Sequence, residues 1–157
     1  MARAEAALRD AAMADHDALG RVMFDAIHHG TSAYSAAERA AWLPTPPRGP
    51  QWSAKLGEQQ VVLAERVGQV IGFITRERGY IDLAFIAAPA QGQGVFRALY
   101  GRVEQAAVAA GESRLHTHAS VMARPAFEAM GFRVIATERI ARSAEYLDRF
   151  EMEKILT

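Results

Sequence analysis

The first third of the chain carries the hydrophobic spacing of helices. A 3.6-residue period predicts a helix over residues 15–28, with a buried face made of Leu19, Val22, Met23, Ala26 and Ile27. Ser35 and Glu38 form a capping-box pattern, which predicts a second, short helix ending at Trp42. The following stretch, LPTPPRGP (43–50), contains four prolines, which cannot donate to a helix or a ladder. We expect a loop or lid there rather than a linker between domains.

The middle of the chain changes to the pattern of strands. The segments QVVLAE (60–65) and VIGFITR (70–76) flank a turn at Gly68, and YIDLAFIA (80–87) follows a second turn. These features predict an antiparallel meander of three strands. The helical period then returns, with a buried face of Val95, Leu99, Val103, Ala106 and Ala110, and Gly111 is placed to cap that helix.

The last third alternates between the two patterns. RLHTHA (114–119) predicts a strand, and ARPAFEAMGF (123–132) predicts a short helix closed by a glycine. Two further strands are predicted by FRVIATERI (132–140) and YLDRFEMEKIL (146–156). The sequence therefore predicts an α/β fold, and residues 1–157 are expected to form a single domain.

Composition narrows the function classes. The 157 residues include no cysteine, which excludes disulfide scaffolds, thiolate zinc sites and a cysteine nucleophile. Eighteen basic and eighteen acidic residues balance to zero, whereas a nucleic-acid-binding domain is usually strongly basic. No apolar run approaches 18 residues, and the first residues lack the apolar core of a signal peptide. We expect a cytoplasmic protein with neither a nucleic-acid nor a membrane partner, and a twofold dimer is the default for such chains.

The segment APAQGQGVFRAL (88–99) places Gly92 and Gly94 between a predicted strand and a predicted helix. Unpaired N–H groups at a helix start can hold an anion, although two glycines also serve a plain tight turn. A Walker loop is excluded because no lysine lies near. The dinucleotide pattern is incomplete, since Arg97 stands at its third glycine, so a nicotinamide dinucleotide binder is the weaker alternative.

Three stretches together resemble the GNAT superfamily of acetyl-coenzyme A dependent N-acetyltransferases. Gln91 and Gly94 match the signature Q/R-x-x-G-x-G/A, whose last position is Phe96 here. LRDAAMADHDAL (8–19) resembles the first strand and opening helix of the family, and SVMARPAFEAMGF (120–132) resembles its late motif. In that motif, Ser120 replaces an asparagine and Phe127 replaces a tyrosine. The resemblance spans nearly the whole chain, and several details are similar to a bacterial subgroup.

The resemblance implies a single-domain GNAT fold, with a mixed, mostly antiparallel sheet that is splayed and flanked by helices. It implies acetyl-coenzyme A as co-substrate, no metal, and direct attack of an amine on the thioester. Main-chain N–H groups would cradle the pyrophosphate, and two β-strand residues would bind the pantetheine arm. The expected coenzyme-binding residues are Phe85, Ile86, Gln91, Gly92, Gln93, Gly94, Val95, Phe96, Arg97, Ser120 and Phe127. Phe96 either narrows the pyrophosphate site or turns toward the core.

Asp82 is the first catalytic candidate, because it interrupts an apolar strand. A lysine-like amine is only ~0.04% neutral at pH 7, so a carboxylate that removes its proton would help. The alternative is a solvated charge at a strand edge. Ser120 is the second candidate, as a coenzyme contact, a helix cap, or both. With Phe127 at the usual tyrosine position, water, Ser120 or another tyrosine must protonate the leaving thiolate.

The acceptor site is expected near the first helices and the proline-rich loop. Its candidate residues are His28, Tyr34, Trp42, Tyr80 and His118, with Trp52 as a further amphipathic side chain that otherwise packs against the sheet. His116 and His118 share one strand face, but the spacing indicates no third metal ligand. A small-molecule primary amine is the expected acceptor. A protein or peptide N-terminus is the alternative acceptor. A non-catalytic module that binds acyl-coenzyme A is the alternative function, and it is favoured by Phe96 and Phe127, which depart from the family's motifs.

Overall fold

The computed structural model describes residues 5–156. The strands within this range are β1 (Ala7–Asp10), β2 (Gln60–Arg66), β3 (Gln69–Glu77), β4 (Tyr80–Ile86), β5 (Arg114–Ser120), β6 (Arg133–Arg142) and β7 (Glu145–Ile155). The helices are α1 (His16–His29), α2 (Ala36–Trp42), α3 (Pro50–Gly57), α4 (Val95–Ala109) and α5 (Arg124–Ala129). The elements predicted from the hydrophobic pattern are all present. No helix in the described range is long and apolar enough to cross a membrane.

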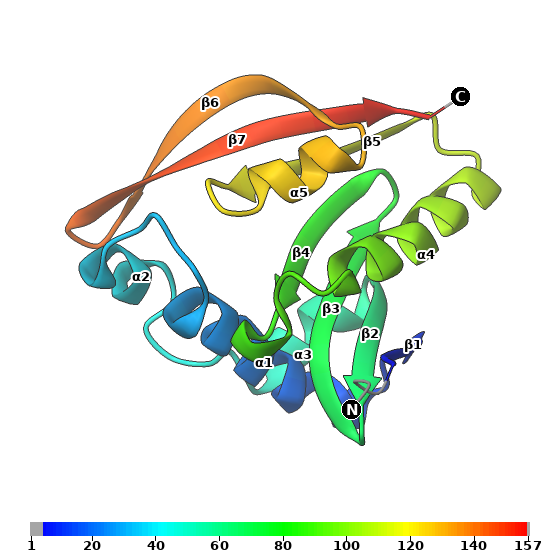
Figure 1. Ribbon diagram of the computed structural model, residues 1–157, viewed down its shortest axis with the longest axis horizontal. Helices are drawn as coiled ribbons and strands as arrows, with labels where there is room; N and C mark the ends of the chain where they lie inside the picture. Colours follow the sequence, from blue (N-terminus) through cyan, green and yellow to red (C-terminus); the bar gives the residue numbers. More distant parts are fainter. Residues whose placement is uncertain (1–4, 157) are drawn as a thin grey trace.

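The strands form one mixed sheet in the order β1-β2-β3-β4-β5-β7-β6. Every neighbouring pair is antiparallel except β4 and β5, which run parallel. Their pairing covers only Tyr80 with His116 and Ile81 with Thr117. Figure 1 shows the consequence, with β5, β6 and β7 forming an upper arm that tilts away from β2, β3 and β4. The α/β class and the splayed, mostly antiparallel sheet predicted from the sequence are confirmed.

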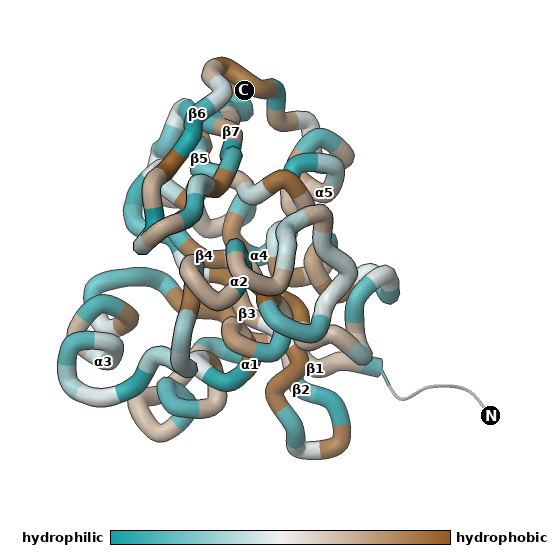
Figure 2. Tube along the Cα trace, turned by 90° about the vertical axis from the view of Figure 1, so that its left-hand side faces the viewer, coloured by the Kyte–Doolittle hydropathy of each residue, from teal (hydrophilic) through white to brown (hydrophobic). Residues whose placement is uncertain are grey.

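Two hydrophobic clusters cover the two faces of the arm of the sheet that is formed by β2, β3 and β4. Along β2, Val62 and Ala64 pack in the cluster that contains α4 and α5, whereas Val61 and Leu63 pack with α1 and α3. Because β2 is buried on both faces, it reads as a continuous apolar run rather than as an alternation. Figure 2 shows largely hydrophobic central strands and many hydrophilic residues on the β6–β7 hairpin. Each fully buried leucine or phenylalanine in these clusters stabilises the fold by roughly 2 kcal/mol.

Two elements were not predicted from the hydrophobic period. Helix α3 begins at Pro50, directly after Gly49 at φ 88°, so the proline-rich stretch ends in a helix start rather than in further loop. Strand β1 has only four residues with no alternation in burial, and only the family resemblance indicated it. Trp52 on α3 is buried and donates from Nε1 to the carbonyl of His16 at 2.7 Å. It therefore packs α3 against α1.

An ion pair at the start of α1 predicts a pH-dependent stability. Arg9 donates to both carboxylate oxygens of Asp15, and this holds the pKa of Asp15 at about 2 against an ordinary value of 3.8. A depressed pKa stabilises the fold above about pH 4, and that contribution is lost between about pH 4 and pH 2. We expect Asp15→Asn to lower the free energy of unfolding by about 1 kcal/mol at pH 7, since Arg9 is partly exposed, and by about half as much at pH 3.

Urea unfolding at both pH values tests this expectation. Asp17→Asn is the matched control, because Asp17 is exposed on the first turn of α1 and has no ion-pair partner among residues 5–156. An equal loss of stability at the two pH values for Asp15→Asn would show that the ion pair is not its cause.

Candidate active site

The site begins where β4 and β5 stop pairing. The hydroxyl of Thr117 donates to the carbonyl of Ile81 at 2.8 Å, which closes one end of the gap between the strands. Beyond this point lie two cavities of about 270 and 360 Å³. Their walls share Trp42, Ala84, Phe85, Ser120 and Ala123. We call the smaller one the acceptor cavity and the larger one the coenzyme cavity, after the roles expected from the sequence for the residues that line them, and they meet at these five residues.

The coenzyme cavity is bounded by the turn that leads into α4. Among the described residues, none of the backbone N–H groups from Gly92 to Arg97 donates to a protein acceptor, and the first bond of the helix runs from Ala98 to Gly94. Gly92 and Gly94 have φ of 74° and 82°, the left-handed conformation in which a side chain is strained. A Cβ atom at either glycine would meet nothing within 4 Å. Six consecutive N–H groups at a helix N-terminus therefore have no acceptor among the described residues, and the space beside the two glycines is open, which is a geometry suited to a phosphate group.

Side chains hold this turn in place. The amide of Gln91 donates to the carbonyl of Ile86 at 3.0 Å, so the signature glutamine ties the turn to the end of β4. Asp25 on α1 accepts from the N–H of Ala88 at 2.7 Å. Arg66, which the sequence did not indicate, donates to Gln93 at 2.9 Å and brings a cation beside the turn. Its position at the end of β2 becomes significant only once β2 and the turn are adjacent in space.

Phe96 and Phe127 pack against each other. Their rings meet edge to face at 5.1 Å, and Phe127 makes a second such contact with Phe132. Phe127 is 2% exposed and lines the acceptor cavity, whereas Phe96 packs against the core and lines the coenzyme cavity. Of the two expectations for Phe96, turning toward the core describes its placement, and the ring still forms part of the cavity wall. Neither ring offers a proton.

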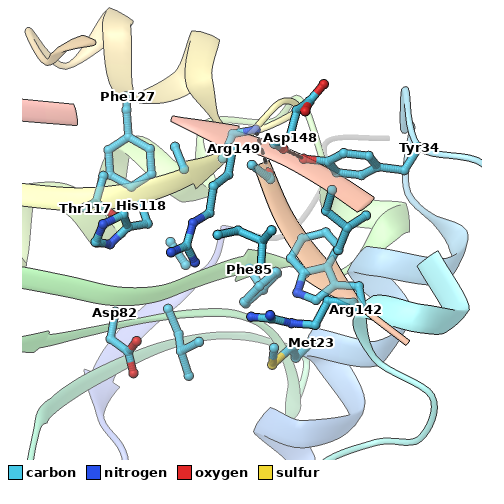
Figure 3. A pocket seen from close by; sticks show the side chains of 18 of the residues that line it. Met23, Tyr34, Asp82, Phe85, Thr117, His118, Phe127, Arg142, Asp148 and Arg149 are labelled. Carbon is cyan, nitrogen blue, oxygen red and sulfur yellow. Dashed lines mark hydrogen bonds between the residues drawn. The ribbon is translucent and has the colours of Figure 1, made fainter. Parts of the chain in front are cut away.

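Asp82 points into the acceptor cavity from β4 (Figure 3). One of its oxygens, Oδ2, accepts from Gln59 at 3.0 Å and lies 3.2 Å from the ammonium of Lys55. Lys55 is on α3, so this partner was hidden from the sequence together with the helix itself. The other oxygen, Oδ1, has no partner among the described residues. Asp82 is thus a fixed carboxylate with one free acceptor atom, rather than a mobile charge at a strand edge.

Tyr80 and His118 lie at the closed end of the acceptor cavity. The phenol oxygen of Tyr80 is 2.9 Å from Nδ1 of His118, and burial raises the pKa of Tyr80. Nε2 of His118 lies 3.4 Å from Glu138, which Arg149 also contacts at 2.9 Å. His116, next along the face, packs on the ring of Tyr80 at 4.8 Å, and burial lowers its pKa.

The side chains around His118 include possible metal ligands that the spacing of residues in the sequence did not indicate. His118, Glu138 and Glu151 offer atoms that all lie within 4.8 Å of one another. The order β5-β7-β6 brings them together, and sequence spacing does not reveal that order. Both ring nitrogens of His118 and both oxygens of Glu138 already have protein partners. The absence of a metal remains a prediction.

The other acceptor-site candidates divide into two groups. Tyr34 and Trp42 line the acceptor cavity, and their rings meet edge to face at 5.7 Å. The hydroxyl of Tyr34 donates to the carbonyl of Asp148 at 2.6 Å and accepts from the N–H of Val121 at 2.9 Å. Tyr34 therefore links the connection between α1 and α2 to the upper arm of the sheet, formed by β5, β6 and β7. The structure does not bring His28 to either cavity. Its ring stacks on Phe24 at 4.1 Å, and Nε2 lies 2.6 Å from the carbonyl of Leu43.

Ser120 lies at the junction of the two cavities. Its hydroxyl accepts from the N–H of Ala123 at 3.1 Å, which caps the turn before α5. Ser120 is therefore not the N-cap of α5, which begins at Arg124 after Ala123 and has no side-chain cap, and its hydroxyl instead stabilises the turn before the helix. On the facing hairpin, Arg142 and Arg149 both direct their guanidinium groups into the acceptor cavity (Figure 3).

The splayed sheet and the free donors at the start of α4 define an acetyltransferase of the GNAT type. Residues 31–156 match the family described as acetyltransferase (GNAT) domain. The chain is 31% identical over 119 residues to Escherichia coli K12 N-acetyltransferase YafP, which covers 76% of this chain and 75% of that relative. This chain belongs to the GNAT acetyltransferase family. The predicted enzyme class, an acetyl-coenzyme A dependent acyltransferase, is confirmed.

Solved structures share the fold at lower sequence identity. A GCN5-related N-acetyltransferase from Rhodopseudomonas palustris superposes with a TM-score of 0.90 at 24% identity, covering 99% of each chain. A phosphinothricin acetyltransferase from Sinorhizobium meliloti, solved in complex with acetyl-coenzyme A, gives a TM-score of 0.71 at 20% identity. That match covers 96% of this chain and 88% of the other.

Proposed function

We propose that this protein transfers the acetyl group of acetyl-coenzyme A directly to the primary amine of a small molecule. The observation that carries the proposal is the shared wall of the two cavities at Ala84, Phe85 and Ser120. A thioester entering from the coenzyme cavity and an amine entering from the acceptor cavity would meet there. The acceptor cavity, at about 270 Å³, has the size of a small-molecule site.

The coenzyme would be held by its phosphates and by the edge of β4. Free N–H groups from Gly92 to Arg97 suit the pyrophosphate, and the nearby cation of Arg66 favours the same charge. The N–H of Ala87 points to β3, where it donates to Ile71 at 2.8 Å. Because successive amides of a strand alternate in direction, the N–H of Ile86 faces the gap toward β5. That N–H is our candidate donor to the oxygen of the reacting carbonyl.

The amine must lose a proton before it attacks. Asp82 lines the acceptor cavity close to the junction of the two cavities, and its Oδ1 atom has no partner among the described residues. We assign this oxygen to the first proton transfer, in which it takes a proton from the amine directly or through one water. Attack forms the C–N bond, the C–S bond breaks, and the second amine proton leaves with the thiolate. With a thiol pKa near 8.5, departure as the unprotonated thiolate is only about 2 kcal/mol uphill at pH 7, so a water beside Ser120 suffices as proton donor where Phe127 offers none.

Thiol release from acetyl-coenzyme A in the presence of amines tests the proposal. We expect turnover with at least one class of small primary amine, and an acetylated product by mass spectrometry. The matched controls are the N,N-dimethyl forms of the same compounds, which retain charge and shape but cannot be acetylated stably. Turnover confined to peptides with free N-termini would move the acceptor to the protein class. Binding of acetyl-coenzyme A without turnover on any amine would overturn the enzymatic assignment of this site.

A further inference from the structure

A chain of polar contacts crosses the closed end of the acceptor cavity from β4 to β6. The hydroxyl of Tyr80 lies 2.9 Å from Nδ1 of His118, and Nε2 of His118 lies 3.4 Å from Oε1 of Glu138. The carboxylate of Glu138 is fixed by Arg149, whose Nε and Nη2 lie 3.0 and 2.9 Å from Oε2. The three groups therefore stand in the order hydroxyl, imidazole, carboxylate. In hydrolase triads, a carboxylate in this position orients the imidazole and stabilises its charged form.

The neighbouring groups favour one arrangement of protons among Tyr80, His118 and Glu138. A neutral His118 with its proton on Nε2 presents an N–H to the carboxylate of Glu138 and a lone pair to the hydroxyl of Tyr80. The other tautomer would set a lone pair against the carboxylate, which is repulsive. Tyr80 therefore donates to His118, and His118 is oriented toward Glu138. The raised pKa of Tyr80 keeps its phenol protonated at neutral pH, so that it passes protons on without holding a negative charge.

The chain is aligned with the proposed reaction along β4. Tyr80 and Asp82 are two positions apart on β4, a spacing of about 6.6 Å along a strand, and both line the acceptor cavity. The pairing of β4 with β3 is irregular between Ile81 and Ala84, so Ala84, at the junction of the cavities, follows Asp82 along the strand without sharing its face. The proposed reaction requires one water between the side chains of Asp82 and Tyr80. At the other end, His118 and Glu138 are 27% and 26% exposed, which gives the chain contact with solvent.

We propose that Tyr80, His118 and Glu138 form a relay that carries the acceptor's first proton from Asp82 to solvent. The inference rests on the proposed function. The ammonium gives this proton to Asp82, which passes it through water to the oxygen of Tyr80 while the phenol proton moves to Nδ1 of His118. The Nε2 proton then passes to Glu138 and on to solvent. The overall reaction converts an ammonium ion and a thioester into an amide, a thiol and one released proton, so the relay's proton is accounted for.

Charged and titratable groups face His118 from the neighbouring strands. Glu138 on β6 and Glu151 on β7 are the facing carboxylates, and Arg149 on β7 is the facing cation. Burial lowers the pKa of His116 on β5 and raises the pKa of Tyr80 on β4, so neither side chain adds a charge near pH 7. The ring therefore lies between carboxylates that can accept the proton of the relay.

Variants of the relay test the proposal through their pH dependence. We expect Tyr80→Phe and His118→Gln each to lower kcat about tenfold near pH 6.5, because slow removal of the first proton limits turnover where the amine is charged. The deficit should shrink toward pH 9, where bulk hydroxide replaces the relay. The double variant should be no slower than His118→Gln alone, since both remove one pathway. KM for acetyl-coenzyme A should stay within twofold of wild type.

His116→Gln is the matched control, because this histidine packs on Tyr80 but takes no part in the contacts that join Tyr80, His118 and Glu138. It should keep kcat within twofold at every pH. A loss of kcat in Tyr80→Phe and His118→Gln that is constant with pH, or smaller than twofold, would overturn the relay. Turnover by the wild-type protein would still support the proposed function in that case. A wild-type protein that acetylates no amine would overturn both.

Discussion

Gly94→Glu is expected to raise the dissociation constant for acetyl-coenzyme A at least about 100-fold, which corresponds to roughly 2.7 kcal/mol. Two effects act together. Gly94 has φ of 82°, where a residue with a Cβ is strained by roughly 1–2 kcal/mol. The new carboxylate would also stand in the open space before the free N–H groups and repel a pyrophosphate there. Isothermal titration calorimetry of the purified variant against acetyl-coenzyme A measures the change.

Two further variants separate these effects. Gly94→Ala introduces the backbone strain without the charge, so it should weaken binding by a much smaller factor. Gly101→Glu adds the same charge to α4 at a helical position where a Cβ meets nothing within 4 Å, and it should bind like wild type. Thermal melts check that each variant is folded. If a folded Gly94→Glu variant bound acetyl-coenzyme A within tenfold of wild type, the phosphate would have to be held elsewhere.

The parts of the fold that the sequence predicted are those in which one local pattern decides the structure. Helix α4 was predicted from apolar residues that recur with one period and from Gly111, with φ of 83°, which follows its end. Val95, Leu99 and Val103 of the predicted face are buried, whereas Ala106 is only partly buried and Ala110 is exposed beyond the last residue of the helix. Helix α2 was predicted from its cap alone, and the structure shows both reciprocal bonds between Ser35 and Glu38. Such signals lie within about ten residues of the chain, so no knowledge of the tertiary structure is needed.

The missed elements have signals that are local but contradictory. The four prolines before α3 mark irregular backbone, yet the last of them, Pro50, occupies the first helical position, where its missing N–H is not needed. Strand β1 at the sheet edge is too short to show a period. The omission of α3 had a consequence for the site, because Lys55, the cation beside Asp82, lies on that helix.

The site was predicted where it follows one strand or one turn, and missed where it depends on strand order. The glycine turn and Asp82 belong to single segments, so the motif located the turn and the interrupted apolar run located Asp82. The alternation that placed Tyr80, Asp82 and Ala84 on one face was wrong, because β4 is irregular between Ile81 and Ala84. The contact between His118 and Glu138 requires β7 to lie between β5 and β6, with Glu151 opposite His118 and Arg149 opposite Glu138. Register between distant strands is set by packing and turn geometry, and no spacing in the sequence encodes it. Arg66 was missed for the same reason.

Asp82→Asn is expected to lower kcat about 100-fold at pH 7, within the range for loss of a positioned acid or base. The amide retains the shape and the contact with Gln59 but cannot accept the acceptor's proton at its free oxygen. The neutral fraction of a lysine-like amine rises about tenfold per pH unit below its pKa near 10.4. The variant should therefore approach wild type as the pH rises from about 6 to 9, and its affinity for acetyl-coenzyme A should be unchanged.

Initial rates of thiol release across this pH range measure the effect, with calorimetry on the same samples for coenzyme binding. Asp17→Asn controls for the change of an aspartate elsewhere on the surface. Lys55→Met tests the ion pair, because it removes the ammonium 3.2 Å from Asp82 while the contact of Asp82 with Gln59 remains. We expect that variant to keep most of its activity. Equal turnover of wild type and Asp82→Asn from pH 6 to 9 would remove Asp82 from the mechanism, and with it the entry point of the proton relay.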